Sequence, residues 1–186
     1  ENILVTDDGR LLISGLGLHQ IVQENGAYRS KQVSPTNDHY FGMTQYQQWV
    51  FAVTQQAGCE QIAWKKCSFL MVAKLAPDLP LQFTKVKKLS GYSQSESLLS
   101  LDFVNGIAAD RHGNLYINDT LSRNTAVLPM DYSMAVPRAG ILSRLPILGN
   151  VFPNGMKIKN NVLYLSYGFA KVLKYPLHPG ATQYLL

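Results

Sequence analysis

The sequence predicts an all-β fold, a β-propeller of four-stranded antiparallel blades. Two observations predict it. A strand–turn–strand pattern returns about every 45 residues, and the helical period of 3.6 residues is missing from the 186-residue chain. Units of this length with several short strands are typical of propeller blades. A β-sandwich is the alternative, but it would not explain the recurring period. We therefore expect a single propeller domain.

Four copies of the unit align, and they begin at Glu1, Phe41, Val104 and Pro153. Each copy has a short strand with alternating apolar residues, a turn rich in Asp, Gly, Asn or Gln, and a second apolar strand. These turns consist of residue types that accept a positive φ, as tight hairpins require. The clearest turns are Asp8-Gly9, His112-Gly113-Asn114 and Asn160-Asn161.

Further strand-like sequence follows each copy and completes the blades. Third strands are predicted at 19–22, 68–73, 124–128 and 171–175. A fourth strand is predicted at 139–144, and the interleaved lysines of 85–89 are typical of a solvated edge strand. Only 95–101 is compatible with a short helical turn. The four blades are then expected at approximately 1–40, 41–100, 101–148 and 149–186.

The composition excludes several classes of protein. Apolar residues make up 46% and charged residues 16% of the chain, which indicates a globular rather than a disordered protein. No apolar run approaches the ~20 residues that span a bilayer, so no membrane span is expected. The net charge is +5, but the Lys and Arg residues are scattered and no nucleic-acid-binding motif accompanies them. We therefore expect no nucleic-acid partner.

The two cysteines, Cys59 and Cys67, lie close together in a predicted loop. They are able to close a small disulfide-bonded ring in an oxidising compartment. The alternative is two free thiols, with Cys67 buried as a small apolar residue. A disulfide would favour a periplasmic or secreted protein. The chain shows no signal-peptide pattern at Glu1, which is compatible with the earlier removal of a leader or tag.

An Asn-Gly pair occurs at the same place in the third and fourth units, as Asn105-Gly106 and Asn154-Gly155. The first strand of each propeller blade lines the central channel, so the two Asn side chains are predicted to face each other across one mouth of that channel. Glycine lets another backbone approach closely because it has no Cβ. A ring of amide and carboxylate oxygens is what Ca²⁺ requires. The alternative for each pair is an ordinary turn.

These residues resemble the calcium-dependent six-bladed propellers of the gluconolactonase, regucalcin and paraoxonase superfamily. The resemblance includes Glu1 in ENILVTDDGRLLISGLGL and the two Asn-Gly units. It implies that Glu1, Asn105 and Asn154 hold a catalytic Ca²⁺ or another divalent cation, with a fourth ligand from a further blade. It also implies six blades, of which this chain supplies four. Missing blades or self-association of two chains would complete the ring, and a closed four-bladed propeller is the third alternative.

The sequence also departs from that family. A histidine expected before the glycine of the second unit is replaced by Phe41, and His39 is the nearest candidate general base. Thr54-Gln55 replaces a second expected histidine. Asn2 and Gly106 stand where acidic residues would hold a second, structural calcium, so we expect that ion to be missing.

The matches to this family and the departures from it are compatible with two functions. The first is a metal-dependent hydrolase of lactones or related esters, a small-molecule enzyme in which Ca²⁺ polarises the substrate carbonyl. The alternative is a non-catalytic propeller that binds a ligand or a partner protein. Other polar residues are given structural roles: Asp110 and Asp119 are predicted to bind turn amides, and His112 and His178 to lie in loops. No Gly-x-Ser-x-Gly motif occurs.

Overall fold

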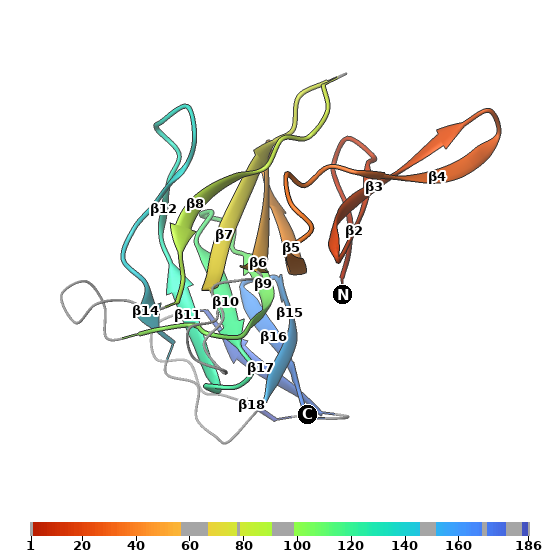
Figure 1. The fold of residues 1–186 in the computed structure, drawn as a ribbon. Coiled ribbons are helices and arrows are strands. Elements are labelled where there is room, and N and C mark those ends of the chain that lie inside the picture. The colour runs from red at the N-terminus through yellow and green to blue at the C-terminus, as the bar shows by residue number, and fades with distance from the viewer. Residues whose placement is uncertain are drawn as a thin grey trace.

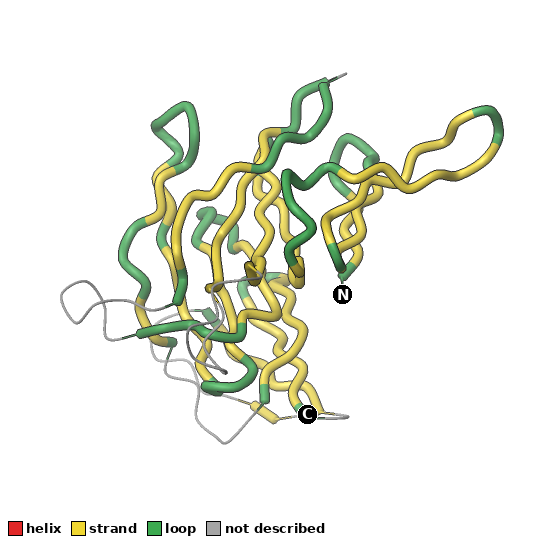
Figure 2. The backbone as a smooth tube through the Cα atoms, in the orientation of Figure 1, coloured by secondary structure: helices red, strands yellow, loops and turns green. Residues whose placement is uncertain are grey.

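The computed structural model describes residues 2–56, 67–77, 79–90, 99–145, 152–168, 171–177 and 184–185. These residues form strands and loops without a helix (Figure 2). The strands make four antiparallel four-stranded sheets, which follow one another around an arc (Figure 1). The predicted all-β propeller architecture is confirmed. Within the described ranges no helix has the length and apolar character needed to cross a membrane.

Each sheet is one blade, and its strands are adjacent in sequence order, with one interruption in blade 3. Blade 1 consists of β1 (Ile3–Val5), β2 (Leu11–Gly15), β3 (Gly17–Glu24) and β4 (Ala27–Gln32). Blade 2 consists of β5 (His39–Tyr46), β6 (Trp49–Gln56), β7 (Cys67–Lys74) and β8 (Thr84–Lys88). Blade 3 consists of β9 (Val104–Ala109), β10 (Leu115–Asp119), β11 (Asn124–Leu128) and β14 (Ser143–Arg144). Blade 4 consists of β15 (Pro153–Lys159), β16 (Val162–Tyr167), β17 (Lys171–Pro176) and β18 (Tyr184–Leu185).

The hairpin turns form where the sequence predicts them. Gly9 and Gly113 have φ of 86° and 82°, and Asn160 and Asn161 have φ of 51° and 60°. Two consecutive positive φ values are the geometry of a type I′ turn, whose twist matches that of the flanking strands. The turn chemistry therefore sets the register of the β15–β16 hairpin.

The fourth strand predicted at 139–144 is wrong as a single strand. Arg138–Ala139 (β13) pairs instead with Met130–Asp131 (β12), and only Ser143–Arg144 (β14) joins blade 3. Gly140 interrupts the segment, and its N–H donates to the Pro129 carbonyl 2.9 Å away. The predicted helical turn at 95–101 lies partly outside the described residues, and 99–101 are not helical.

The core lies between neighbouring blades. β6 is buried on both faces: Trp49, Phe51 and Val53 pack toward blade 3, whereas Val50 and Ala52 pack toward blade 1. A strand covered on both sides reads as a continuous apolar run, as 49–53 does. Burial on both faces holds blades 1, 2 and 3 together as one body.

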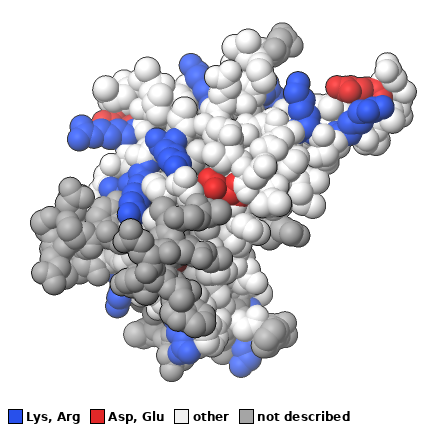
Figure 3. Space-filling model, viewed as in Figure 1, with Lys and Arg blue, Asp and Glu red and all other residues white. Residues whose placement is uncertain are grey.

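The periphery is more polar. β4 is exposed along its whole length, and the β3–β4 hairpin extends away from the other blades (Figure 1). Lys and Arg side chains are spread over the visible face in several small groups (Figure 3). Cys67, at the start of β7, is disulfide-bonded. The sequence has one other cysteine, Cys59, which lies outside the described residues.

Candidate functional site

The Asn-Gly pairs form β-bulges inside strands rather than turns. The register of β9 against β10 jumps so that Asn105 and Gly106 together oppose Asn118. The register of β15 against β16 jumps in the same way, with Asn154 and Gly155 opposing one residue. Bulges bend a strand and re-aim its side chains, and they occur often beside active sites. Blade 2 has the same irregularity at 41–42.

The glycine of the bulge allows neighbouring inner strands to touch. A Cβ on Gly42 would lie 2.6 Å from the Asn105 carbonyl oxygen, and one on Gly106 would lie 2.6 Å from the Asn154 carbonyl oxygen. Real Cβ atoms do not approach backbone oxygen so closely. The contact places β5 against β9 and β9 against β15 at equivalent points. Close backbone approach therefore explains these two glycines.

A polar residue opposite the bulge connects one blade to the next. Asn118 is fully buried. It accepts a hydrogen bond from the Gly106 N–H at 2.6 Å and donates one to the Asn154 carbonyl at 2.7 Å. Ser14 does the same in blade 1, where its hydroxyl accepts from the Asn2 N–H at 2.7 Å and donates to the Phe41 carbonyl of blade 2. Both side chains therefore hold the next inner strand in place.

The bulges of blades 2, 3 and 4 place three residues at equivalent positions. Asn2 takes the place of Gly106, because both N–H groups donate to the bridging side chain. Phe41, Asn105 and Asn154 each stand just before a bulge glycine, and Glu1 is the residue that precedes Asn2 in the sequence. Glu1 itself lies outside the described residues. The structure thus brings Asn105 and Asn154 onto adjacent strands and puts Phe41 on the next strand.

The orientation of the Asn105 amide is fixed by its neighbours. The Thr120 hydroxyl donates to the Pro153 carbonyl at 2.6 Å, so it accepts from the Asn105 NH₂ group at 3.3 Å. The amide oxygen Oδ1 of Asn105 consequently points away from Thr120. No hydrogen bond within the described ranges engages this oxygen or the side chain of Asn154, which is exposed. Both amide oxygens are available to a ligand.

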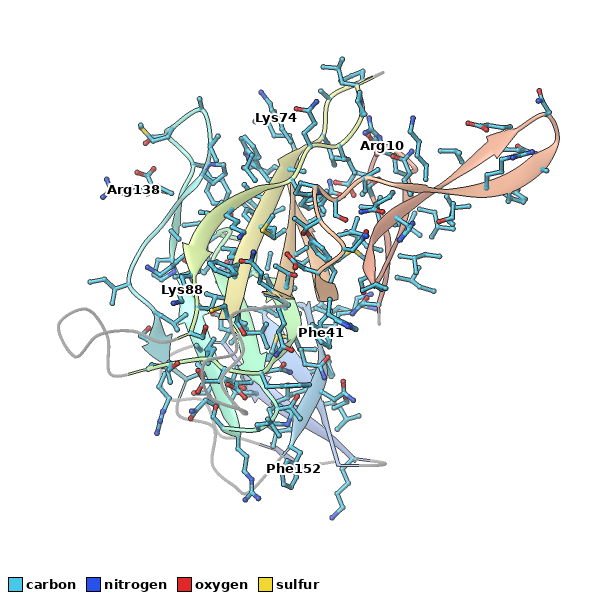
Figure 4. The ribbon with its side chains drawn as sticks, in the orientation of Figure 1. Arg10, Phe41, Lys74, Lys88, Arg138 and Phe152 are labelled. Atoms are coloured by element: carbon cyan, nitrogen blue, oxygen red, sulfur yellow. The ribbon has the colours of Figure 1, made fainter. Side chains whose placement is uncertain are left out.

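Three aromatic rings lie in series where β5 packs against β9. The His39 and Phe41 rings stack with centroids 6.3 Å apart, and the Phe41 and Phe103 rings are tilted with centroids 5.7 Å apart. His39 is exposed, whereas Phe41 and Phe103 are half-buried. Figure 4 shows Phe41 near the point where β5 approaches β9 and β15. His39 and Phe41 therefore point to the same side, as the strand alternation predicts.

Other polar residues that the sequence analysis named form hydrogen bonds with the backbone. The Thr54 hydroxyl donates to the His39 carbonyl at 2.8 Å, and the Gln55 amide donates to the Asp102 carbonyl at 3.2 Å. The Asp110 carboxylate accepts from the N–H groups of His112 and Asn114 in the hairpin. These structural roles agree with the prediction for Asp110.

Asp119 is also a structural carboxylate. It is fully buried and accepts four backbone N–H groups, those of Asp102, Phe103, Leu121 and Ser122. His112 is exposed in its turn, and His178 lies outside the described residues.

The described residues contain no group of three or more His, Cys, Asp or Glu side chains arranged to hold a metal ion. The predicted calcium set is of a different kind, because it combines Glu1 with two amides. Two clefts lie elsewhere in the described structure. One of about 450 Å³ lies between the hairpins of blades 3 and 4, at Asp110 and Asn160. The other, about 610 Å³, is beside Arg10 and Lys31.

Comparison with solved structures identifies the fold. The structure matches one described as a "putative gluconolactonase", with a TM-score of 0.62 and 15% identity. The chain has the fold of a gluconolactonase-like β-propeller. The match covers 100% of this chain and 62% of that one, so the chain spans less than two thirds of that protein.

Two further matches are looser. One is the PQQ-bound aldose sugar dehydrogenase of Streptomyces coelicolor, with a TM-score of 0.47, 12% identity and coverage of 100% of this chain and 80% of the other. The second is described as a "putative oxidoreductase (glucose dehydrogenase)" of Thermus thermophilus, with a TM-score of 0.49, 9% identity and coverage of 99% and 81%. No protein-family model matches the chain, and no curated protein matches it.

Sequence reasoning missed the residues that orient the site. Thr120 fixes the Asn105 amide, and Asn118 joins the two Asn-bearing strands. Phe103 contributes a ring from just before β9. One signal was available for Asn118 and Ser14: each is a polar residue that follows three apolar residues in the second strand of a unit.

Proposed function

We propose that this protein is a calcium-dependent hydrolase of lactones or related esters, in which Glu1, Asn105 and Asn154 hold the ion. The observation that supports the proposal is the oriented amide of Asn105, whose NH₂ group is taken by Thr120. Its oxygen is left free at a position equivalent to that of Asn154. Amide and carboxylate oxygens suit Ca²⁺, which takes several oxygen ligands at once.

When bound, Ca²⁺ or another divalent cation would supply a Lewis acid for the substrate carbonyl. The chain's own residues would do the remaining work. The two amide oxygens fix the position of the site relative to β9 and β15. The exposed imidazole of His39 is the candidate base. It would accept a proton from the attacking water and return it to the ring oxygen as the lactone C–O bond breaks, giving a hydroxy acid.

The test is a lactone-hydrolysis assay on the complete protein, with calcium and then with excess EGTA. We expect EGTA to abolish turnover and added Ca²⁺ to restore it. His39→Gln is expected to lower kcat about 100-fold with little change in KM. His112→Gln is the matched control, because His112 is an exposed histidine in a distant hairpin turn. Full turnover in EGTA would contradict the role of calcium, and a wild-type kcat in His39→Gln would exclude His39 as the base.

A second candidate function is a non-catalytic binding propeller. Phe41 favours it, because an aromatic ring stands at a position equivalent to those of Asn105 and Asn154. This alternative predicts calcium or ligand binding without turnover of any lactone or aryl ester. Calorimetric titration beside the hydrolysis assay separates the two functions.

A further inference from the structure

We propose that the cleft beside Arg10 and Lys31 binds a ligand in which one carboxylate is attached to an apolar body. The cleft has a volume of about 610 Å³, within the range of about 300–1,000 Å³ that is usual for ligand pockets. It lies where β1 turns into β2, whereas Phe41 and the bulges lie near the start of the inner strands, at the other end of the blades (Figure 4). The site is therefore separate from the candidate calcium site and does not depend on the hydrolase proposal.

Two strands of blade 1 supply the polar wall of the cleft. Gln20 of β3 pairs with Lys31 of β4, and Val22 pairs with Arg29 two residues along. Directly paired residues point to the same face of a sheet, and so do residues two apart along a strand. Leu12 pairs with Gln20 and is buried in the cluster that contains blade 2 residues. Gln20 and Lys31 therefore stand side by side on the face that is turned toward blade 2.

The apolar wall comes from a blade 2 loop and from blade 1, and its residues are Pro77, Leu79, Pro80, Val22 and Val33. Arg10 holds the loop, because its guanidinium donates to the Ala76 carbonyl at 2.6 Å and to the Leu79 carbonyl at 2.9 Å. Leu79 is nevertheless 62% exposed. An apolar ligand body placed against this side chain would remove apolar surface from water, which favours binding.

The charge that remains unpaired at the cleft is positive. The Arg10 Nε lies 3.0 Å from the Asp8 carboxylate, so these two charges largely cancel. Within the described ranges, neither the Lys31 ammonium nor the Gln20 amide has a hydrogen-bond or ion-pair partner. Arg29 adds a second cation on the same face. Lys31 and Gln20 can both donate to one carboxylate, and hydrogen bonds to a charged group are stronger than those between neutral groups.

Calorimetric titration of the complete protein with octanoate tests the proposal. Octanamide is the matched ligand, because it has the same tail and no charge. We expect saturable binding of octanoate and about tenfold weaker binding of octanamide. Lys31→Met should weaken octanoate binding about tenfold and leave octanamide binding unchanged, whereas Lys31→Arg, which keeps the charge, should retain most of the affinity. Lys159→Met is the matched control, because Lys159 is an exposed lysine of blade 4.

Two results of that titration would overturn the proposal: no saturable binding of octanoate, or wild-type affinity for octanoate in Lys31→Met. Leu79→Ser tests the apolar wall and should weaken both ligands, since both carry the same tail. Unchanged affinity for both ligands in Leu79→Ser would also overturn the proposal.

The titrations are done in excess EGTA, so that they do not depend on a calcium ion. Asn105→Ala should bind octanoate as the wild-type protein does. Loss of octanoate binding in Asn105→Ala would place the ligand at the bulges and overturn the proposal. Binding that depends on Lys31 in a protein without lactonase activity would support this site while contradicting the hydrolase proposal.

A fatty acid and the C-terminus of a peptide share the chemistry of this ligand. N-acetyl-leucyl-leucine and its C-terminal amide form a second pair of ligands that distinguishes the two sources. Tighter binding of the dipeptide than of octanoate assigns the site to a peptide C-terminus, and weaker binding assigns it to a fatty acid. Both results support the carboxylate site, provided that the affinity of the tighter ligand falls in Lys31→Met.

Discussion

Blades 2 and 3 bend their inner strands at the same place, but different residues stand there. In blade 3 the bulge carries Asn105 and is opposed by the buried amide of Asn118. In blade 2 the bulge carries Phe41, and Val53 is the residue that stands opposite it. Both bulges have a glycine whose absent Cβ lets the next strand approach. The backbone geometry is thus common to both blades, while the residue before the glycine is free to carry a ligand oxygen or a ring.

Substitution of the two bulge glycines is expected to have the largest effect on stability. Gly42→Ala and Gly106→Ala each place a Cβ 2.6 Å from a neighbouring carbonyl oxygen, so the blades must separate. We expect the free energy of unfolding to fall by about 3 kcal/mol or more in each variant. Urea unfolding measures the loss.

Gly155→Ala is the matched control for that experiment. Among the described residues, its Cβ would meet the Ser166 hydroxyl alone, at 3.3 Å. We expect a loss below about 1 kcal/mol. Equal losses in all three variants would show that the bulge itself, rather than contact between blades, requires glycine.

Asn118→Val replaces the residue opposite the blade 3 bulge with valine, the residue type that stands opposite the blade 2 bulge. This substitution has the next largest expected effect. It removes the partners of the Gly106 N–H and the Asn154 carbonyl. We expect the free energy of unfolding to fall by about 2–3 kcal/mol, because a buried donor is left unpaired. Ser166→Ala serves as control, since the exposed Ser166 hydroxyl exchanges hydrogen bonds with Gly155 of its own blade. A similar loss in both variants would argue against a bridge between blades.

Two tyrosines at the hairpin end of blade 3 are expected to make the stability depend on pH, with a smaller effect than the substitutions above. Burial, together with Asp110, raises the pKa of Tyr116 to about 12, and burial raises the pKa of Tyr132 as well. An unfolded tyrosine loses its proton near pH 10, so the unfolded state is favoured as the pH rises from there. We expect the contribution of the two phenols to the urea midpoint to be constant below pH 10 and to be lost as the pH rises toward 12.

Tyr116→Phe should reduce that alkaline loss, because the group with the raised pKa is removed. Tyr28→Phe should leave it unchanged, since Tyr28 is 76% exposed. A midpoint that does not change between pH 10 and pH 12 in the wild-type protein would contradict the burial of the two phenols.

Much of the fold could be predicted from the sequence because its signals are local. The turns at Gly9 and Asn160-Asn161 and the strand alternation depend on neighbouring residues only. The bulges could not be predicted, because a bulge is a register shift between two strands, and a lone Asn-Gly pair looks like a turn. The roles of Thr120 and Phe103 depend on contacts with the next strand, which the sequence does not specify.

The central claim is that the amide oxygens of Asn105 and Asn154 coordinate a calcium ion. Calorimetric titration of the complete protein with Ca²⁺ tests this claim most directly. The account predicts saturable binding that weakens at least about tenfold in Asn105→Ala and in Asn154→Ala. It predicts a smaller loss in Thr120→Val, which frees the Asn105 amide to rotate. It predicts wild-type affinity in Asn124→Ala, because Asn124 lies in β11 and its amide donates to the Ser122 hydroxyl in the preceding turn. Absence of calcium binding in the wild-type protein, or unchanged affinity in Asn105→Ala, would contradict it.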